Sequence, residues 1–466
     1  MVAALLACIF SALAVMMFML AFSPRFYPGR GNYSSTSMLF ASWLVAIVIL
    51  TSYTFMLQVG GLPDISFDRI FLVLLLANVT HRALKHDLVH GQNKLVEVLM
   101  LVFCVICLIS MTRFGFFEIY SEFARPSFIF LSGYLIPFMA FVVAKYFLSG
   151  EEDILLVFKV FFWFGCYLVL IAFLERFDLR NFVFPPYIVD PAISALHLDR
   201  SRGPFLNSAF NGLALNFAFI CGMLVLPTVK GAMQKVHVLL LLSYFPAIYF
   251  TRTRSVYLHF LVTLAAIAIL YRAKSAWKRL IPPIMALAVV FVVANLDTLT
   301  SANREAGGIG EMTEIYVRLE LAAKSRNLLF EHPFGGIGLA QFRTGSLFLP
   351  SELQFQHNHL IGMAVELGLP GVGIYLAILL VIFRRLCKLA DTIPEGQFLN
   401  LNFVVLMMAG LFITLINNVF VEPTLHLFAG VNFFALAGIV DQLYNRFALR
   451  PRALYPTADS PERSAR

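Results

Sequence analysis

The feature that most constrains the fold of this chain is a series of long apolar runs that contain almost no charged residues. Such runs recur at residues 2–22, 38–57, 95–111, 128–148, 154–174 and 209–226, and continue beyond them. About 20 apolar residues in a helix cross about 30 Å of hydrocarbon, where each helix satisfies its own backbone hydrogen bonds. The sequence therefore predicts an all-α integral membrane protein.

Composition excludes a water-soluble fold. Charged residues make up 13% of the 466 residues, whereas soluble globular proteins contain about 25%. The apolar runs predict a polytopic bundle of about 12 to 13 transmembrane helices. Because these helices pack on one another, residues 1–466 are expected to form a single membrane domain.

The distribution of basic residues predicts the topology. The net charge is +8, but the basic residues form no stripe of the kind that binds nucleic acid. They gather in short loops: Arg272, Lys274, Lys278 and Arg279, then Arg384, Arg385 and Lys388, then Arg446, Arg450 and Arg452. The positive-inside rule makes these loops and the tail at residues 445–466 cytoplasmic. Residues 296–356 then form a large periplasmic loop, and the N-terminus is external with thirteen spans or internal with twelve.

Polar residues concentrate in three external segments, of which the first covers residues 200–212. A Gly-Pro pair stops any helix there, and Asn207 or Ser208 can cap the span that follows. This helix start would leave free backbone N–H groups facing outward, beside Arg200 and Arg202. The segment suits an anionic group, or its arginines simply mark the membrane boundary.

The second segment is the sequence TRTR at residues 251–254, between two apolar runs. External arginines run against the usual charge bias, so Arg252 and Arg254 require an anion to explain them. Either a lipid phosphate or a substrate diphosphate satisfies two guanidinium groups.

The third segment is the large loop itself, which mixes acidic and basic residues. Its residues 311–330 are predicted to form a helix with Ile315, Leu319 and Ala322 on one apolar face. Arg318 and Arg326 would then lie about 12 Å apart along that helix.

The remainder of the loop leads into the next span. His332 and Pro333 are expected to end the helix, and the glycines at positions 335, 336 and 338 to form a flexible joint. His357 and His359 open the next apolar run, as metal ligands, a general base or interface residues. No cysteine and no clear acidic partner stands at ligand spacing, so no metal site is predicted.

The order of these motifs resembles the O-antigen ligase/polymerase superfamily. RxRGPFxN stands before one span and TRTR before another, and RLELAAKSRNLLFEHPFGGIGLAQF leads to HNHLIGMAVELGLPGVGIYL. The resemblance is strongest over residues 200–385. The chain departs from the family by having Asn-Ser-Ala at residues 207–209, where Asn-Pro-Asn is frequent. It also has two arginines in TRTR, of which Arg254 is the better match.

The resemblance implies a GT-C-like glycosyltransferase of the bacterial inner membrane that needs neither a metal nor another cofactor. Its donor would be a glycan linked to undecaprenyl diphosphate, and transfer would occur on the periplasmic side to a sugar hydroxyl. A ligase uses the lipid A core of lipopolysaccharide as acceptor. A polymerase of O-antigen, capsule or exopolysaccharide uses another lipid-linked unit, and this is the favoured reading.

The same resemblance assigns roles to residues found in the three segments. Arg202, Arg254 and Arg318 are predicted to bind the diphosphate, and His357 to act on the acceptor hydroxyl, with His359 as its rival. Further candidates for the site are Arg200, Arg252, Arg326 and Asn358. The expected partners are the bilayer, the donor, the acceptor and other polysaccharide assembly proteins. A flippase for lipid-linked oligosaccharides is the alternative function, and a structural scaffold is a third.

Overall fold

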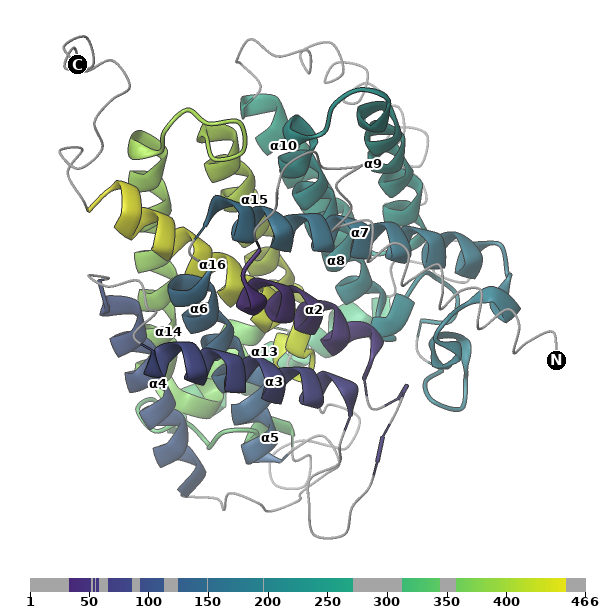
Figure 1. Ribbon diagram of the computed structural model, residues 1–466. Coiled ribbons are helices and arrows are strands. Elements are labelled where there is room, and N and C mark those ends of the chain that lie inside the picture. Colours follow the sequence, from purple (N-terminus) through teal and green to yellow (C-terminus); the bar gives the residue numbers. More distant parts are fainter. Residues whose placement is uncertain are drawn as a thin grey trace, which may run out of the picture.

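The computed structural model describes residues 33–51, 53–54, 56–57, 66–85, 93–112, 125–148, 150–195, 197–270, 312–343 and 358–449. All regular elements in this part of the chain are helices (Figure 1). The prediction of an all-α polytopic membrane protein is therefore confirmed.

Eight helical segments among the described residues are long and apolar enough to cross a membrane. They are α4 (Leu95–Thr112), α5 (Pro126–Phe130) continued by α6 (Ile136–Phe147), α7 (Glu151–Arg176), α8 (Ser208–Val225), α9 (Ala232–Phe250), α14 (His359–Thr392), α15 (Leu401–Phe420) and α16 (Leu427–Phe447). Four further α-helices are α2 (Ser35–Ile49), α3 (Phe67–Leu84), α10 (Arg254–Leu270) and α13 (Met312–Glu331). The apolar run at residues 2–22 and the segment at residues 271–311 lie outside the described residues. The total of about 12 to 13 spans therefore stays a prediction.

Helices α7, α8 and α16 form the interior of the bundle, and nearly all of their side chains are buried. In Figure 1, α4 and α14 lie on one side of this interior, and α9 and α10 lie on the other. Aromatic rings fill the space between the central helices, as where Phe161 meets Phe217 edge-on with ring centres 5.1 Å apart. The apolar runs thus pack chiefly against one another.

Contacts between helix ends sort the loops into two groups. At one end the carboxyl end of α7 meets the segment before α8 and the loop between α9 and α10. We call this the site end and define it as residues 175–208, 250–254 and 421–426. The opposite end holds the ends of α6, α14 and α16 and the start of α4, around Lys145, Arg385 and Asn93.

A buried charge cluster joins four helices at the opposite end. The Lys145 ammonium contacts the carboxylates of Glu97 and Asp441, and Arg385 contacts Asp441 as well. The side chain of Asn93 accepts a further hydrogen bond from Arg385 at 2.7 Å. Two cations and two carboxylates balance one another, which is how charges are accommodated inside a membrane bundle.

The predicted helix of the large loop is confirmed as α13 (Met312–Glu331), which ends directly before His332. Its packing face is not the predicted one, because Leu321, Ser325 and Leu328 are buried. Leu319 is 63% exposed, and Ala322 is exposed as well. The apolar spacing therefore marks a face of α13 that points away from the protein.

A backbone clasp fastens the end of α13 to a kink in α14. Gly368 has a non-helical backbone there, and Pro370 lacks an N–H, so the α14 carbonyls one turn earlier lose their usual donors. Ile337 N–H donates to Val365 O at 2.9 Å, and Gly338 N–H donates to Glu366 O at 3.0 Å. The Leu369 N–H donates in return to the Pro333 carbonyl at 2.8 Å.

Two glycines make this clasp possible. A Cβ atom on Gly336 would lie 2.3 Å from the Glu366 carbonyl oxygen, and one on Gly368 would lie 2.7 Å from the Phe334 backbone. Both residues also have positive φ angles, which glycine adopts without strain. The glycines therefore form a tightly packed junction, and the predicted flexible joint is wrong.

Candidate active site

The site end brings together the first two polar segments of the sequence. Ser201 N–H donates to the Phe250 carbonyl at 2.9 Å, and the Thr253 hydroxyl donates to Ser208 Oγ at 2.9 Å. Residues separated by 45 or more positions in the chain therefore share one polar region. We take this region as the candidate active site.

Glu175, in the last turn of α7, organises the turn that precedes α8. Its carboxylate accepts hydrogen bonds from the Ser201 hydroxyl at 2.8 Å and from the Gly203 N–H at 3.2 Å. The Arg202 N–H is 3.3 Å from the same carboxylate. Glu175 is not among the predicted site residues, although an acidic residue at the end of an otherwise apolar run is a usable signal.

Arg202 is buried, and its side chain donates hydrogen bonds to the loop that precedes α8. Its side chain is 1% exposed, with Nε donating to the Ile188 carbonyl at 2.8 Å and Nη1 to the Ser194 carbonyl at 2.7 Å. Burial lowers the pKa of Arg202, and the nearby Glu175 carboxylate opposes that shift. This geometry bonds the Arg202 side chain to its own loop, and its role as a diphosphate ligand stays a prediction.

The start of α8 is capped as predicted but does not present free donors. Asn207 is the N-cap, and its side chain accepts from the Ala209 N–H at 2.9 Å and the Phe210 N–H at 3.4 Å. The Ser208 N–H donates to His197 Nδ1 at 3.0 Å. The expectation of free N–H groups for an anion is therefore wrong, because these donors are already bonded within the protein.

His197 belongs to a hydrogen-bonded chain that the sequence analysis did not identify. Its Nδ1 accepts the backbone N–H of Ser208, so Nδ1 carries no proton and the ring is the neutral Nε2–H tautomer. The Ser208 hydroxyl lies 3.0 Å from the same nitrogen and accepts from Thr253. This chain fixes the TRTR loop against α8. No spacing within residues 195–255 would have revealed it.

The two arginines of TRTR differ from Arg202 in being exposed. Arg254 is the first residue of α10, and Arg252 has a left-handed backbone with φ of +45°. The nearby Arg200 is largely covered, and its Nε lies 3.4 Å from the Asp199 carboxylate. Arg252 and Arg254 are therefore accessible to a ligand, as are Arg176 and Arg180 beside the end of α7.

Backbone strain concentrates around these residues. Five non-glycine residues in the described part of the chain have positive φ, and four of them lie at the site end: Asp178, His197, Leu206 and Arg252. Such conformations cost free energy and persist where the surroundings enforce them, frequently at functional sites.

The third polar segment enters the site through α14. His357 lies outside the described residues. Asn358 is the N-cap of α14 and accepts from the Ile361 N–H at 3.1 Å. His359 is 3% exposed, with its ring 6.2 Å from that of Tyr134 and 5.5 Å from that of Tyr375, so it lies inside the bundle. Of the two histidines, His359 is therefore enclosed by aromatic rings.

The loop at residues 421–426 joins this segment to α8. The Thr424 carbonyl accepts from the Ser132 hydroxyl at 3.3 Å, two residues before the Tyr134 that contacts His359. The His426 ring lies 3.8 Å from the Phe210 ring in the first turn of α8. Burial lowers the pKa of His426 to about 4, so this imidazole is neutral near pH 7.

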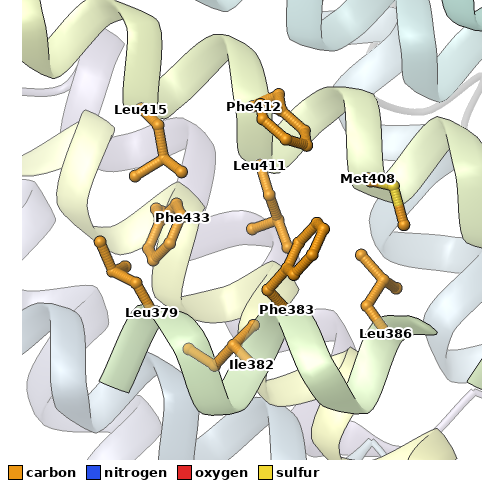
Figure 2. A pocket seen from close by; sticks show the side chains of 9 residues that line it. All are labelled: Leu379, Ile382, Phe383, Leu386, Met408, Leu411, Phe412, Leu415 and Phe433. Carbon is orange, nitrogen blue, oxygen red and sulfur yellow. The ribbon is translucent and has the colours of Figure 1, made fainter. Parts of the chain in front are cut away.

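Arg318 and Arg326 are exposed on α13, which packs on α14. Within the described residues no group of three or more histidine, cysteine, aspartate or glutamate side chains is arranged to hold a metal ion. A small cavity of about 30 Å³ lies elsewhere, between α14, α15 and α16. Figure 2 shows that its nine lining side chains are all apolar, so it offers no group for transfer chemistry.

The fold and this region define a multi-pass membrane protein with an arginine-containing polar site at one end of its helices. A family model described as O-antigen ligase matches residues 237–376, which include most of α9, the TRTR loop, α10, α13 and the first half of α14. The resemblance to the O-antigen ligase/polymerase superfamily is thereby confirmed, and with it a ligase- or polymerase-type function. A search of curated proteins gave no match.

Proposed function

We propose that this protein transfers a glycan from undecaprenyl diphosphate to the hydroxyl of an acceptor sugar at the site end. We place that end on the periplasmic side of a bacterial inner membrane, following the charge bias of the loops. The observation that carries the proposal is the pair of exposed arginines, Arg252 and Arg254, on a strained loop hydrogen-bonded to α8 through Thr253.

The arginines would stabilise the diphosphate leaving group. Cleavage of the glycosyl–phosphate bond leaves negative charge on the diphosphate, which guanidinium groups stabilise without a metal ion. In our assignment Arg254 is the principal diphosphate ligand, with Arg252 beside it. Arg202 holds the supporting loop through the carbonyls of Ile188 and Ser194. Arg318 and Arg200 are secondary candidates.

His357 is our candidate for the general base that takes the proton of the acceptor hydroxyl. Its rival His359 is buried between two tyrosine rings, which supports the choice of His357. Asn358 uses its carbonyl oxygen to cap α14, which fixes the backbone next to His357. A neutral imidazole is needed for this role, so activity should fall as the pH drops through about 6.5.

We favour a polymerase over a lipid A core ligase, because a cell with several polysaccharides needs several polymerases and usually one ligase. A flippase would instead place arginines along a central cavity. In the described residues the exposed TRTR arginines lie at one end of the bundle, which favours the transferase.

The test is transfer by the purified protein between a lipid-linked donor and a glycan acceptor. His357→Ala should lower the rate by about 10²- to 10⁴-fold, the usual contribution of a general base, and should leave donor binding nearly intact. His332→Ala removes an exposed histidine of the same loop and serves as the matched control, which should keep its activity. Chelator should have no effect.

Other outcomes would redirect the assignment. Loss of activity with chelator and its return with zinc would make His357 a metal ligand. Loss in His359→Ala alone would transfer the role of base to His359. A protein that moves donor across vesicle membranes without forming a glycosidic bond would be a flippase.

A further inference from the structure

Helix α13 carries large apolar side chains on the face that points away from the protein, as well as on its packed face. Tyr316, Leu319 and Phe330 are 65%, 63% and 77% exposed. Their spacing of three and eleven residues places them on one stripe of a helix with 3.6 residues per turn. The opposite face, with Leu321 and Leu328, packs on the protein. Water alone gives no reason for such a stripe.

The length of α14 locates α13 relative to the bilayer. α14 has 34 residues, so at 1.5 Å per residue it is about 51 Å long, against about 30 Å of hydrocarbon. Arg384 is exposed and marks one membrane boundary. Counting back about 20 residues from it puts the other boundary close to the kink at Gly368. The clasp joins the end of α13 to α14 at this level.

The stripe is continuous with the membrane-facing side of α14. Phe334 is 77% exposed, and its backbone packs directly on Gly368. The next residue, Leu369, is 49% exposed and shares one side of α14 with Leu376 and Leu380, which are 45% and 49% exposed. Exposed apolar side chains thus occur on α14, at Phe334 and on α13.

Basic residues accompany the stripe. Arg326 lies between Leu319 and Phe330 along the helix axis and is exposed. Arg318, about 12 Å away along α13, is exposed as well. Helices that rest on a membrane surface combine aromatic and aliphatic residues on one side with arginine or lysine that meets lipid phosphate.

We propose that α13 is an interfacial helix that lies in the bilayer surface. Its stripe of Tyr316, Leu319 and Phe330, continued by Phe334, faces the boundary between headgroups and acyl chains, and Arg326 reaches the lipid phosphates. The clasp holds α13 at this depth. The described part of the large loop, residues 312–343, is then held at the membrane, and this placement does not depend on the reaction that the protein performs.

The experiment places a photoreactive phenylalanine analogue, p-benzoylphenylalanine, at position 330 or 334 of the full chain. The protein is reconstituted in vesicles of phosphatidylethanolamine and phosphatidylglycerol and irradiated, and adducts are identified by mass spectrometry. Position 380 on α14 is the positive control. Position 324 is the matched negative control, because Lys324 lies about 120° to 140° around α13 from Leu319 and Phe330. Its ammonium pairs with Glu320 at 2.8 Å.

We expect phospholipid adducts at positions 330, 334 and 380 and no phospholipid adducts at position 324. Adducts at 330 and 334 that join two chains would show that the stripe contacts a second copy instead. Adducts within one chain would show that another segment of the protein covers it. Either result, or lipid adducts at 380 alone, would overturn the proposal.

Discussion

The two ends of the bundle both bury an arginine, but the surroundings of the two arginines differ. At the opposite end, Arg385 shares the carboxylate of Asp441 with Lys145, and Glu97 supplies the second negative charge. At the site end, the Arg202 guanidinium donates hydrogen bonds to the backbone carbonyls of Ile188 and Ser194. The charges of the first end are balanced by other side chains, whereas Arg202 is built into a loop.

The backbone shows the same contrast. The residues of the charge cluster lie in regular helices, whereas the site end holds four of the five positive-φ non-glycine residues that the structure describes. It also presents the exposed Arg252 and Arg254. A balanced, regular cluster has no need of a ligand, while strained loops with accessible guanidinium groups suit one. We infer that the first end serves stability and the second serves function.

The strongest test of this contrast is Asp441→Asn. The variant leaves Lys145 and Arg385 buried without their shared carboxylate, and removal of one partner from a buried ion pair costs about 3 to 5 kcal/mol. We expect a large loss of folded protein, measured by thermal unfolding monitored by size-exclusion chromatography.

Glu97→Gln is the control, because Glu97 contacts the same lysine but is 20% exposed and can be replaced in part by water. Its effect should be smaller. Equal stability of Asp441→Asn and the wild type would mean that the cluster is not a structural element.

The second test compares two arginine-to-lysine variants at the site end. An ammonium cannot reproduce the planar donor pair of a guanidinium. Arg254→Lys should lower transfer by roughly ten- to more than a hundredfold, equivalent to about 1.5 to 3 kcal/mol, at unchanged thermal stability. Arg202→Lys should lower thermal stability first, because one of the Ile188 and Ser194 carbonyls loses its donor.

The converse result would reverse the two roles. If Arg202→Lys kept its stability and lost donor affinity, Arg202 would be a substrate ligand as the sequence first indicated. If Arg254→Lys assembled polysaccharide at the wild-type rate, Arg254 would mark only the membrane boundary.

The fold class was predictable because it depends on composition and on the period of apolar runs. The cap at Asn207 and the helix of residues 312–331 were likewise predictable, since both follow from local residue preferences. The polar segments were found by charge bias alone, and two of them do meet in space.

The features that could not be predicted from the sequence depend on contacts between residues far apart in the chain. Three features of the site depend on tertiary structure. They are the burial of Arg202, the hydrogen bond from the Gly203 N–H to Glu175, and the hydrogen bond from the Ser208 N–H to His197. The packing face of α13 was misassigned because an apolar stripe was assumed to face protein, and in a membrane protein a second apolar medium is available. The run of glycines at 335, 336 and 338 predicts a flexible joint because spacing does not reveal the Glu366 backbone that packs against Gly336.

The smallest expected effect comes from a matched pair of helix caps, one at each end. Asn207 caps α8 at the site end, and Asn400 caps α15 by accepting the Phe403 N–H at 3.1 Å. Replacement of either by alanine should cost about 1 kcal/mol of stability, since each leaves helix N–H groups without an acceptor.

The Asn207→Ala and Asn400→Ala variants should differ in transfer activity. Asn207→Ala loosens the turn that carries Ser208, and through it the Thr253 contact that fixes the TRTR loop. A loss of up to about fivefold in transfer rate is expected, the equivalent of about 1 kcal/mol in the transition state. Asn400→Ala, equally destabilised, should transfer at the wild-type rate when assayed well below its unfolding temperature. Equal activity of the two variants would show that the α8 cap does not contribute to the reaction. The position of the TRTR loop would then not depend on that cap.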